Sequence, residues 1–304
     1  MNRNSVNWHG SFAVIVTPFK QDGSIDEAGY RQIIDFIIDS GCHGVITAGS
    51  TGEFFLMSSD ERKRVFEICV DQTAGRVPVI ACPAAIRTED VVDYTKAAKK
   101  VGCDGVMVLP PIYVKISDNE IEEFYKRVAG EGGLPLMLYN SPFAVNVYLT
   151  PKLIEKLVKI DEVVAIKDSS FDMLQFSNLV RSVKDEIRLF IGLEHMFVPA
   201  LAIGADGAVA MSPPIAGRMA SELYDSYVAG DLARAQELHV RMARLYDIFE
   251  VGSMYSCIKE SLKLQGMPGG YTRAPMLPFD EEQKAKLAAI LSELGLLEAR
   301  KAAE

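Results

Sequence analysis

Apolar residues recur along the chain in eight short, nearly continuous runs that are rich in β-branched residues. A continuous apolar run predicts a strand that is buried on both faces, as in a parallel sheet. The runs cover residues 12–18, 44–49, 77–83, 105–111, 134–140, 163–169, 188–192 and 207–213.

Longer stretches between these runs place apolar residues at steps of three and four, which is typical of amphipathic helices. Several begin at Ser, Thr or Asp and end at Gly, residues that cap helices. These stretches cover residues 26–41, 59–75, 88–102, 118–130, 150–160, 171–185 and 194–205. The alternation of strand and helix, repeated eight times, predicts a (β/α)8 TIM barrel rather than an open sheet.

The eighth strand is followed by a helical pattern at 219–230, which closes the barrel, and then by three more. The sequence therefore predicts an α/β barrel over residues 1–228 and a C-terminal helical extension, packed on the barrel, over residues 229–304. No linker or low-complexity segment separates the two.

Composition and charge limit the kinds of molecule that the protein is expected to bind. The 304 residues are 49% hydrophobic and 24% charged, with a net charge of −9. The chain has no long basic run, so we expect neither nucleic acid nor a membrane as partner. We read no signal peptide at the N-terminus. The five cysteines form no C-x-x-C pair, which favours reduced thiols in the cytoplasm.

The histidines predict no metal site. There are four of them, scattered along the sequence without an HExxH pattern. We expect no metal and no organic cofactor.

Lys167 is the most unusual residue at a predicted strand end. It follows the apolar run 163–166 directly, and burying an ammonium is unfavourable unless the group is paired or neutral. One interpretation is a lysine that reaches solvent or pairs with Asp168. The other is a desolvated amine that attacks carbonyl groups. Strand alternation turns Asp168 to the opposite face, which favours the second interpretation.

Two further features belong to the same end of the predicted barrel. Tyr139 ends the neighbouring strand, within reach of Lys167, and a phenol can shuttle protons. Ser50 and Thr51 precede Gly52 in a tight turn whose hydroxyl and N–H groups suit a carboxylate. An amine nucleophile, a proton shuttle and a carboxylate site together predict an enzyme that forms a Schiff base with a 2-oxo acid such as pyruvate.

With these residues in place, the chain resembles the dihydrodipicolinate synthase/N-acetylneuraminate lyase family of class I aldolases. The motifs GSTGE (49–53) and YNSP (139–142) and the lysine of the sixth strand stand in the family's order and spacing. The resemblance implies that Lys167 forms the imine and that Tyr139 relays protons. It also implies a homotetramer arranged as a dimer of dimers.

The resemblance assigns further positions. Ser50 and Thr51 correspond to hydroxyl residues that contact the keto acid carboxylate and the relay. Tyr113 corresponds to a tyrosine that often completes the relay across a tight dimer interface. Gly192 and Val209 correspond to positions whose backbone lines the keto acid site.

Departures from the family bear on the rest of the substrate. The synthases usually carry an arginine five residues after the relay tyrosine, and this chain has Ala144, which cannot bind a carboxylate. The lyases bind sugar hydroxyls with acidic residues at positions that are Glu194 and His195 here. With Phe143, these residues are the predicted contacts to the distal half of the substrate.

Three functions stay open at this point. The first is a Schiff-base lyase of pyruvate or a related 2-oxo acid, by aldol cleavage, condensation or dehydration, for example of a 2-keto-3-deoxy sugar acid. The second is 4-hydroxy-tetrahydrodipicolinate synthase, which condenses pyruvate with aspartate semialdehyde and is disfavoured by Ala144. The third is a keto acid-binding scaffold without turnover.

Overall fold

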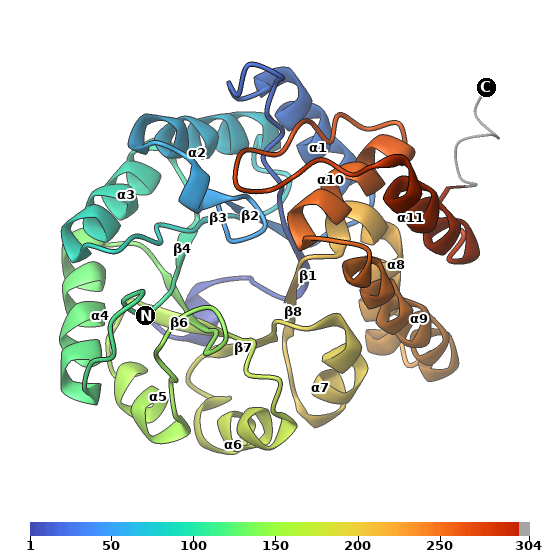
Figure 1. Cartoon of the computed structure of the whole chain (residues 1–304). Coiled ribbons are helices and arrows are strands. Elements are labelled where there is room, and N and C mark those ends of the chain that lie inside the picture. The colour runs from blue at the N-terminus through green and yellow to red at the C-terminus, as the bar shows by residue number, and fades with distance from the viewer. Residues whose placement is uncertain (298–304) are drawn as a thin grey trace.

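Eight parallel strands close into a barrel in the computed structural model, which describes residues 1–297 (Figure 1). Each strand pairs with the next, and the eighth pairs with the first. The predicted TIM barrel is confirmed. The strands are β1 (Gly10–Val14), β2 (Gly44–Thr47), β3 (Val79–Ala81), β4 (Gly105–Val108), β5 (Leu136–Asn140), β6 (Val163–Asp168), β7 (Arg188–Ile191) and β8 (Gly207–Ala210).

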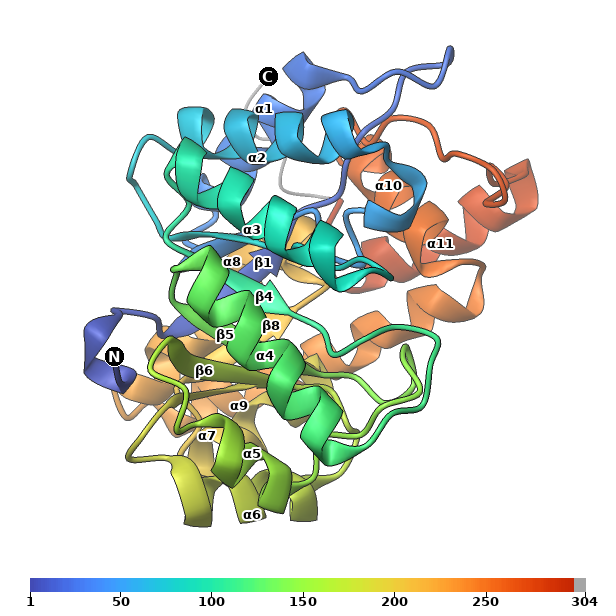
Figure 2. The ribbon, with the colours of Figure 1, turned by 90° about the vertical axis from the view of Figure 1, so that its left-hand side faces the viewer.

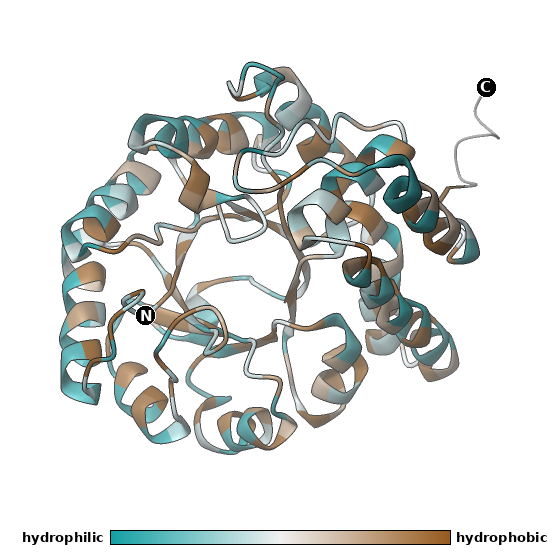
Figure 3. Ribbon diagram, in the orientation of Figure 1, coloured by the Kyte–Doolittle hydropathy of each residue, from teal (hydrophilic) through white to brown (hydrophobic). Residues whose placement is uncertain are grey.

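Helices surround the barrel and turn their apolar faces to the strands (Figure 3). Among residues 1–297, no helix combines the length and the apolar composition needed to cross a bilayer. The helices of the ring are α1 (Glu27–Asp39), α2 (Ser59–Thr73), α3 (Thr88–Val101), α4 (Asp118–Gly132), α5 (Pro151–Leu157), α6 (Met173–Val183), α7 (Phe197–Ile203) and α8 (Pro213–Val228).

The paired strands are shorter than several of the apolar runs that predicted them. The run at 12–18 continues beyond β1, and Ile15 and Val16 are buried although they follow the last strand residue. Residues that leave a strand remain beneath the loops at the mouth of the barrel, so burial extends further than strand pairing. Short 3₁₀ helices, which the periodicity did not predict, form η1 (Arg3–Ser5), η2 (Phe54–Leu56), η3 (Glu194–Met196) and η4 (Leu245–Glu250).

The C-terminal extension forms α9 (Leu232–Arg244), α10 (Met254–Leu264) and α11 (Glu281–Glu293). α9 packs against α8, and α10 contacts both α8 and α11. Figure 2 shows α10 and α11 on the side of the barrel opposite the N-terminus. The predicted boundary at 228/229 falls at the end of α8, and residues 298–304 of the predicted extension lie outside the described residues.

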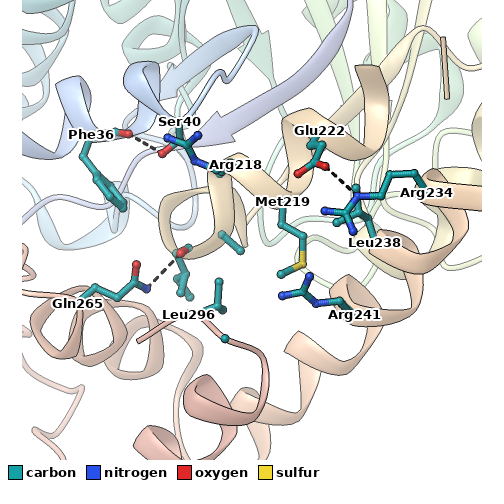
Figure 4. A pocket seen from close by; sticks show the side chains of 14 residues that line it. Phe36, Ser40, Arg218, Met219, Glu222, Arg234, Leu238, Arg241, Gln265 and Leu296 are labelled. Atoms are coloured by element: carbon teal, nitrogen blue, oxygen red, sulfur yellow. Dashed lines mark hydrogen bonds and ion pairs between the residues drawn. The ribbon is translucent and has the colours of Figure 1, made fainter. Parts of the chain in front are cut away.

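A groove of about 340 Å³ follows the outer seam between α1, α8 and the extension (Figure 4). Its basic side chains include Arg234, whose Nε donates to Glu222 at 2.8 Å, and Arg241, which donates to the Leu294 carbonyl at 2.7 Å. None of the residues predicted for catalysis lines this groove. Three of them, Ser50, Tyr139 and Lys167, line a cavity at the ends of the strands instead.

Candidate active site

A cavity of about 320 Å³ lies at the carboxyl ends of the strands. Active sites of this fold form at that end, because the loops that follow the strands converge there. The cavity is lined by Val14, Ser50, Thr51, Met107, Tyr139, Ser141, Phe143, Ala144, Lys167, Ser169, Phe171, Gly192, Leu193, Met211, Met254 and Tyr255. Seven of these are site residues that the sequence predicted: Ser50, Thr51, Tyr139, Phe143, Ala144, Lys167 and Gly192.

Lys167 is buried in this cavity, with 6% of its surface exposed. It is paired in register with Tyr139 of the neighbouring strand, and its Nζ lies 4.3 Å from the centroid of the Tyr139 ring. Within residues 1–297, no carboxylate forms an ion pair with it. Lys167 therefore neither reaches solvent nor pairs with Asp168, so the first of the two interpretations is wrong.

The Asp168 carboxylate points away from the lysine and into its own hydrogen bonds. Its oxygens accept from the Ser170 N–H at 2.7 Å and from the Asn140 side-chain amide at 3.3 Å. Burial raises the pKa of Asp168 above its usual value, and these hydrogen bonds oppose that shift. The alternation of side chains along β6 thus separates the amine from the carboxylate next to it in sequence.

Gly192 gives Lys167 the space that it occupies. A Cβ at this position would lie 2.9 Å from Lys167 Cε and 1.9 Å from Ser169 Oγ. The Gly192 N–H donates to the Asp168 carbonyl at 2.7 Å, which fixes the backbone close to β6. Any side chain at residue 192 would displace the lysine.

The turn that follows β2 has a strained backbone conformation. Ala48 and Glu53 both have positive φ, at 50° and 59°, although neither is glycine. Thr17 Oγ1 donates to the Gly52 carbonyl at 2.8 Å, and a Cβ on Gly52 would lie 2.9 Å from the Ile15 carbonyl oxygen. These contacts hold the Ser50–Thr51 hydroxyls at the cavity wall.

A buried ion pair ties this turn to the C-terminal extension. The Glu53 carboxylate is fully buried and pairs with Nζ of Lys259 in α10, a side chain with 2% exposure. Burial raises the pKa of Glu53 and lowers that of Lys259 to about 8. The sequence interpretation missed this pair. Its only signal is a lysine at 259 among the apolar residues of a helix.

Aromatic residues form the mouth of the cavity. The rings of Phe143 and Phe171 meet edge to face, with centroids 5.3 Å apart. Phe171 has a φ of 60°, which L side chains rarely adopt. Ala144 lies beside Phe143, so this part of the wall carries no cation.

Four predicted site residues do not line the cavity. The Glu194 carboxylate is buried and accepts from the backbone N–H groups of Met211, at 2.9 Å, and Ser212, at 2.7 Å. His195 packs against Tyr246, with ring centroids 4.8 Å apart. Val209 is buried within β8.

Tyr113 is the fourth of these residues. It is 79% exposed, has a φ of 80°, and accepts a hydrogen bond from Asn146 through its backbone carbonyl at 2.9 Å. Within one chain it is absent from the wall of the cavity.

The wall also contains residues that the sequence interpretation did not select. Met254 and Tyr255 come from the first turn of α10, far along the chain from the other lining residues. Ser141 and Ser169 add two hydroxyls near Tyr139 and Lys167 in sequence. Nothing in the local pattern of α10 distinguishes its first turn from an ordinary helix start.

The described residues contain no group of three or more His, Cys, Asp or Glu side chains placed to hold a metal ion. All five cysteines are buried and free.

The family model of the dihydrodipicolinate synthetase family matches residues 7–294. The chain belongs to this family. Its members are lyases of the class I aldolase type, so the predicted family, fold and reaction class are confirmed.

Individual relatives agree with this placement. The chain is 34% identical over 293 residues to an uncharacterized DapA-like lyase of Rhizobium meliloti, a match that covers 96% of this chain and 97% of the relative. It is 33% identical over 288 residues to the 4-hydroxy-tetrahydrodipicolinate synthase of Methanothrix thermoacetophila, covering 94% and 97%.

Among solved structures, the chain is similar to YagE of Escherichia coli K12, a family member crystallised in complex with pyruvate. The TM-score is 0.93 at 28% sequence identity, and the match covers 96% of this chain and 100% of YagE.

Proposed function

We propose that this lyase forms a Schiff base between Lys167 and pyruvate or a related 2-oxo acid. The observation that carries the proposal is a buried lysine in a cavity, in contact with the Tyr139 ring and without a carboxylate partner among the described residues. Only the neutral form of an amine has the lone pair that attacks a carbonyl carbon. A neighbouring carboxylate would hold the ammonium form, and Asp168 is turned away.

The reaction starts when the Lys167 amine attacks C2 of the 2-oxo acid. The C2 oxygen takes one proton from the attacking nitrogen and a second from Tyr139 and leaves as water, while the nitrogen lone pair forms the iminium. The iminium withdraws electrons from C3. Cleavage of the C3–C4 bond, with loss of the C4 hydroxyl proton to a base, gives an enamine and an aldehyde; in dehydration, loss of a C3 proton gives the enamine, which then expels the C4 oxygen as water after that oxygen takes a proton. Aldol cleavage, condensation and dehydration share this path.

The carboxylate of the 2-oxo acid binds at the turn after β2. Ser50 and Thr51 offer two hydroxyl donors from a backbone that is fixed by Thr17 and by the Glu53–Lys259 pair. The turn supplies no charged donor, so we expect the carboxylate to be held by hydrogen bonds, as in other backbone nests. In this assignment Ser50 also contacts the proton relay.

The distal half of the substrate is uncharged. Among residues 1–297, Lys167 is the only charged residue that lines the cavity, and Phe143, Ala144, Phe171 and Met254 also line it. A second carboxylate placed there would lose its hydration without a partner, which is unfavourable. We therefore expect aldehydes or leaving groups with an apolar or weakly polar body.

Borohydride reduction tests the proposal. The full-length protein is incubated with pyruvate or a panel of 2-keto-3-deoxy acids, reduced, digested and weighed. We expect one reduced adduct per chain on the peptide that contains Lys167. An unmodified Lys167 with every 2-oxo acid would overturn the proposed function.

A second candidate is 4-hydroxy-tetrahydrodipicolinate synthase. The synthase of Methanothrix thermoacetophila, at 33% identity, favours it, whereas Ala144 removes the expected carboxylate contact. A coupled assay with pyruvate, aspartate semialdehyde and a reductase decides. We expect little turnover, and we expect Ala144→Arg to raise it. Efficient turnover by the unchanged protein would favour the synthase.

A scaffold without turnover is the third candidate. Exchange of the pyruvate methyl protons with D2O, followed by NMR, requires both the imine and a working base. We expect exchange. Trapping without exchange would favour a keto acid-binding scaffold.

We further propose a cytoplasmic homotetramer. Five buried free thiols favour a reducing compartment. The exposed Tyr113 and Val114, on the loop after β4, favour an interface there, because large apolar groups usually become covered on assembly. Light scattering on the purified protein measures the oligomeric state.

A further inference from the structure

The turn that carries Ser50 and Thr51 has a backbone conformation that its own residues disfavour. Ala48 and Glu53 flank the two hydroxyl residues in sequence, and both have positive φ, which is unfavourable for L residues. The Glu53 N–H closes the turn by donating to the Ser50 carbonyl at 2.9 Å, and the Glu53 carbonyl accepts from the Leu56 N–H at 2.9 Å. The conformation of Glu53 therefore determines where the two hydroxyls lie on the cavity wall.

The side chain of Glu53 stabilises this conformation. Its carboxylate is completely buried, and Lys259 is its only ion-pair partner among residues 1–297. A buried carboxylate without a partner is strongly unfavourable, so the side chain keeps its place only while the lysine is present. A change in the backbone at residue 53 would move the carboxylate away from the lysine. The ion pair therefore opposes relaxation of the strained turn.

Lys259 is held in place independently of the turn. Its Nζ donates to the Tyr271 carbonyl at 2.9 Å and lies 4.4 Å from the centroid of the Phe19 ring. The backbone of Gly269 packs so closely on Lys259 that a Cβ there would lie 1.9 Å from the Lys259 carbonyl oxygen. The ammonium group therefore has a fixed position, and the Glu53 carboxylate is held to it.

We propose that Glu53 and Lys259 are positioning residues for the carboxylate of the 2-oxo acid. The inference rests on the proposed function. Neither residue lines the cavity, so the pair acts through the turn and keeps the Ser50 and Thr51 hydroxyls where a carboxylate can accept from both. Without the pair the turn relaxes and the affinity for the carboxylate falls, whereas Lys167, on β6, keeps its reactivity.

Two probes separate binding of the carboxylate from the reactivity of Lys167: pyruvate, and pyruvamide, which has the same keto carbon and no charge. The full chain is trapped with borohydride over a range of each probe. The ratio of the half-trapping concentration of pyruvamide to that of pyruvate measures the preference for the carboxylate. In Glu53→Gln/Lys259→Met, we expect this preference to fall at least about tenfold while the half-trapping concentration of pyruvamide stays within about twofold.

Two further variants are the controls. Glu53→Gln alone keeps an oxygen that can accept from Lys259 Nζ, so the contact remains and the preference should fall less than about threefold. Leu287→Ala removes buried apolar volume from α11 of the extension and leaves the pair in place. It should lower the urea midpoint without changing the preference, which separates positioning from a general loss of stability.

Each other outcome overturns the inference in a recognisable way. An unchanged preference in the double variant shows that the turn holds without the pair. An equal loss for pyruvate and pyruvamide, or the same loss in Leu287→Ala, gives the pair a role in stability only. A loss in Glu53→Gln as large as in the double variant assigns the effect to the charge of Glu53 and not to its contact with Lys259.

The wild-type protein distinguishes failure of the inference from failure of the proposed function. Equal trapping of pyruvate and pyruvamide leaves the Schiff base standing and removes the carboxylate site, and with it the role of the pair. Absence of trapping with pyruvate and with the whole panel of 2-oxo acids overturns the proposed function and the inference together.

Discussion

Lys167 and Lys259 are both buried, yet they lie in different surroundings. Lys167 ends a strand of the barrel, and its Nζ is 4.3 Å from the centroid of Tyr139. Lys259 lies in a helix of the extension, and its Nζ is 4.4 Å from the centroid of Phe19. Lys259 also pairs with Glu53 and donates to the Tyr271 carbonyl at 2.9 Å.

Burial and an aromatic ring are common to the two sites, so neither feature identifies a reactive lysine. The partners do. Lys259 has a carboxylate and a carbonyl that satisfy its charge, whereas Lys167 has neither among the described residues. A buried charge with partners holds two segments together, and a buried amine without them is available for chemistry.

The largest expected effect comes from Lys167→Met. Turnover and borohydride trapping should fall at least about 10⁴-fold, because the nucleophile is gone. The free energy of unfolding, measured with urea, should stay the same or rise, because an unpaired amine is replaced by an apolar chain of similar length. A large loss of stability would show that Lys167 is a structural lysine like Lys259.

Lys259→Met should instead lower the stability of the fold. It leaves the Glu53 carboxylate buried without its partner, so the free energy of unfolding should drop by about 3–5 kcal/mol. Urea denaturation measures this loss. The double variant Glu53→Gln/Lys259→Met is the control, and it should recover much of the stability because no buried charge remains.

Tyr139→Phe gives Lys167 the same kind of aromatic neighbour that Lys259 has. The ring contact is kept and the proton shuttle is lost, so kcat should fall about a hundredfold while borohydride still traps some imine. Steady-state kinetics and mass spectrometry check the two parts. Unchanged kcat would assign the proton transfer to another group.

The smallest expected effect is a change in the free energy of unfolding with pH. The folded pKa of Lys259, about 8, lies below its ordinary value of 10.5. Between these values the unfolded chain binds more protons than the folded one, so this lysine makes the protein more stable as pH rises from 8 to 10.5. The slope is at most about 1.4 kcal/mol per pH unit. Subtracting the urea curve of the Glu53→Gln/Lys259→Met variant isolates the contribution, and a flat difference would contradict it.

The sequence predicted the barrel and one side of the cavity for a physical reason. Continuous apolar runs and helical periods recur eight times, and a barrel closed in chain order places Tyr139 and Lys167 on adjacent strands in register. Residue 192 was also predicted to lie at this site, and only glycine fits there beside Lys167 and Ser169. Their catalytic roles stay predictions.

The remaining parts depend on contacts that a local pattern does not encode. Glu53 and Lys259 meet only because α10 folds back over the β2–α2 loop, and Tyr255 reaches the cavity by the same path. Glu194 is adjacent to the site in sequence, but its carboxylate binds the backbone after β8 instead of the cavity.

The Glu53–Lys259 pair has a consequence for the order in which the protein is made. The turn that contains Ser50, Thr51 and Glu53 is synthesised early, but the Glu53 carboxylate lacks its partner until residue 259 has left the ribosome. A nascent chain that ends at residue 228 would contain all eight strands and Lys167, and still lack Tyr255 and the partner of Glu53. Residues beyond 228 are therefore required both to complete the cavity wall and to pair the Glu53 carboxylate.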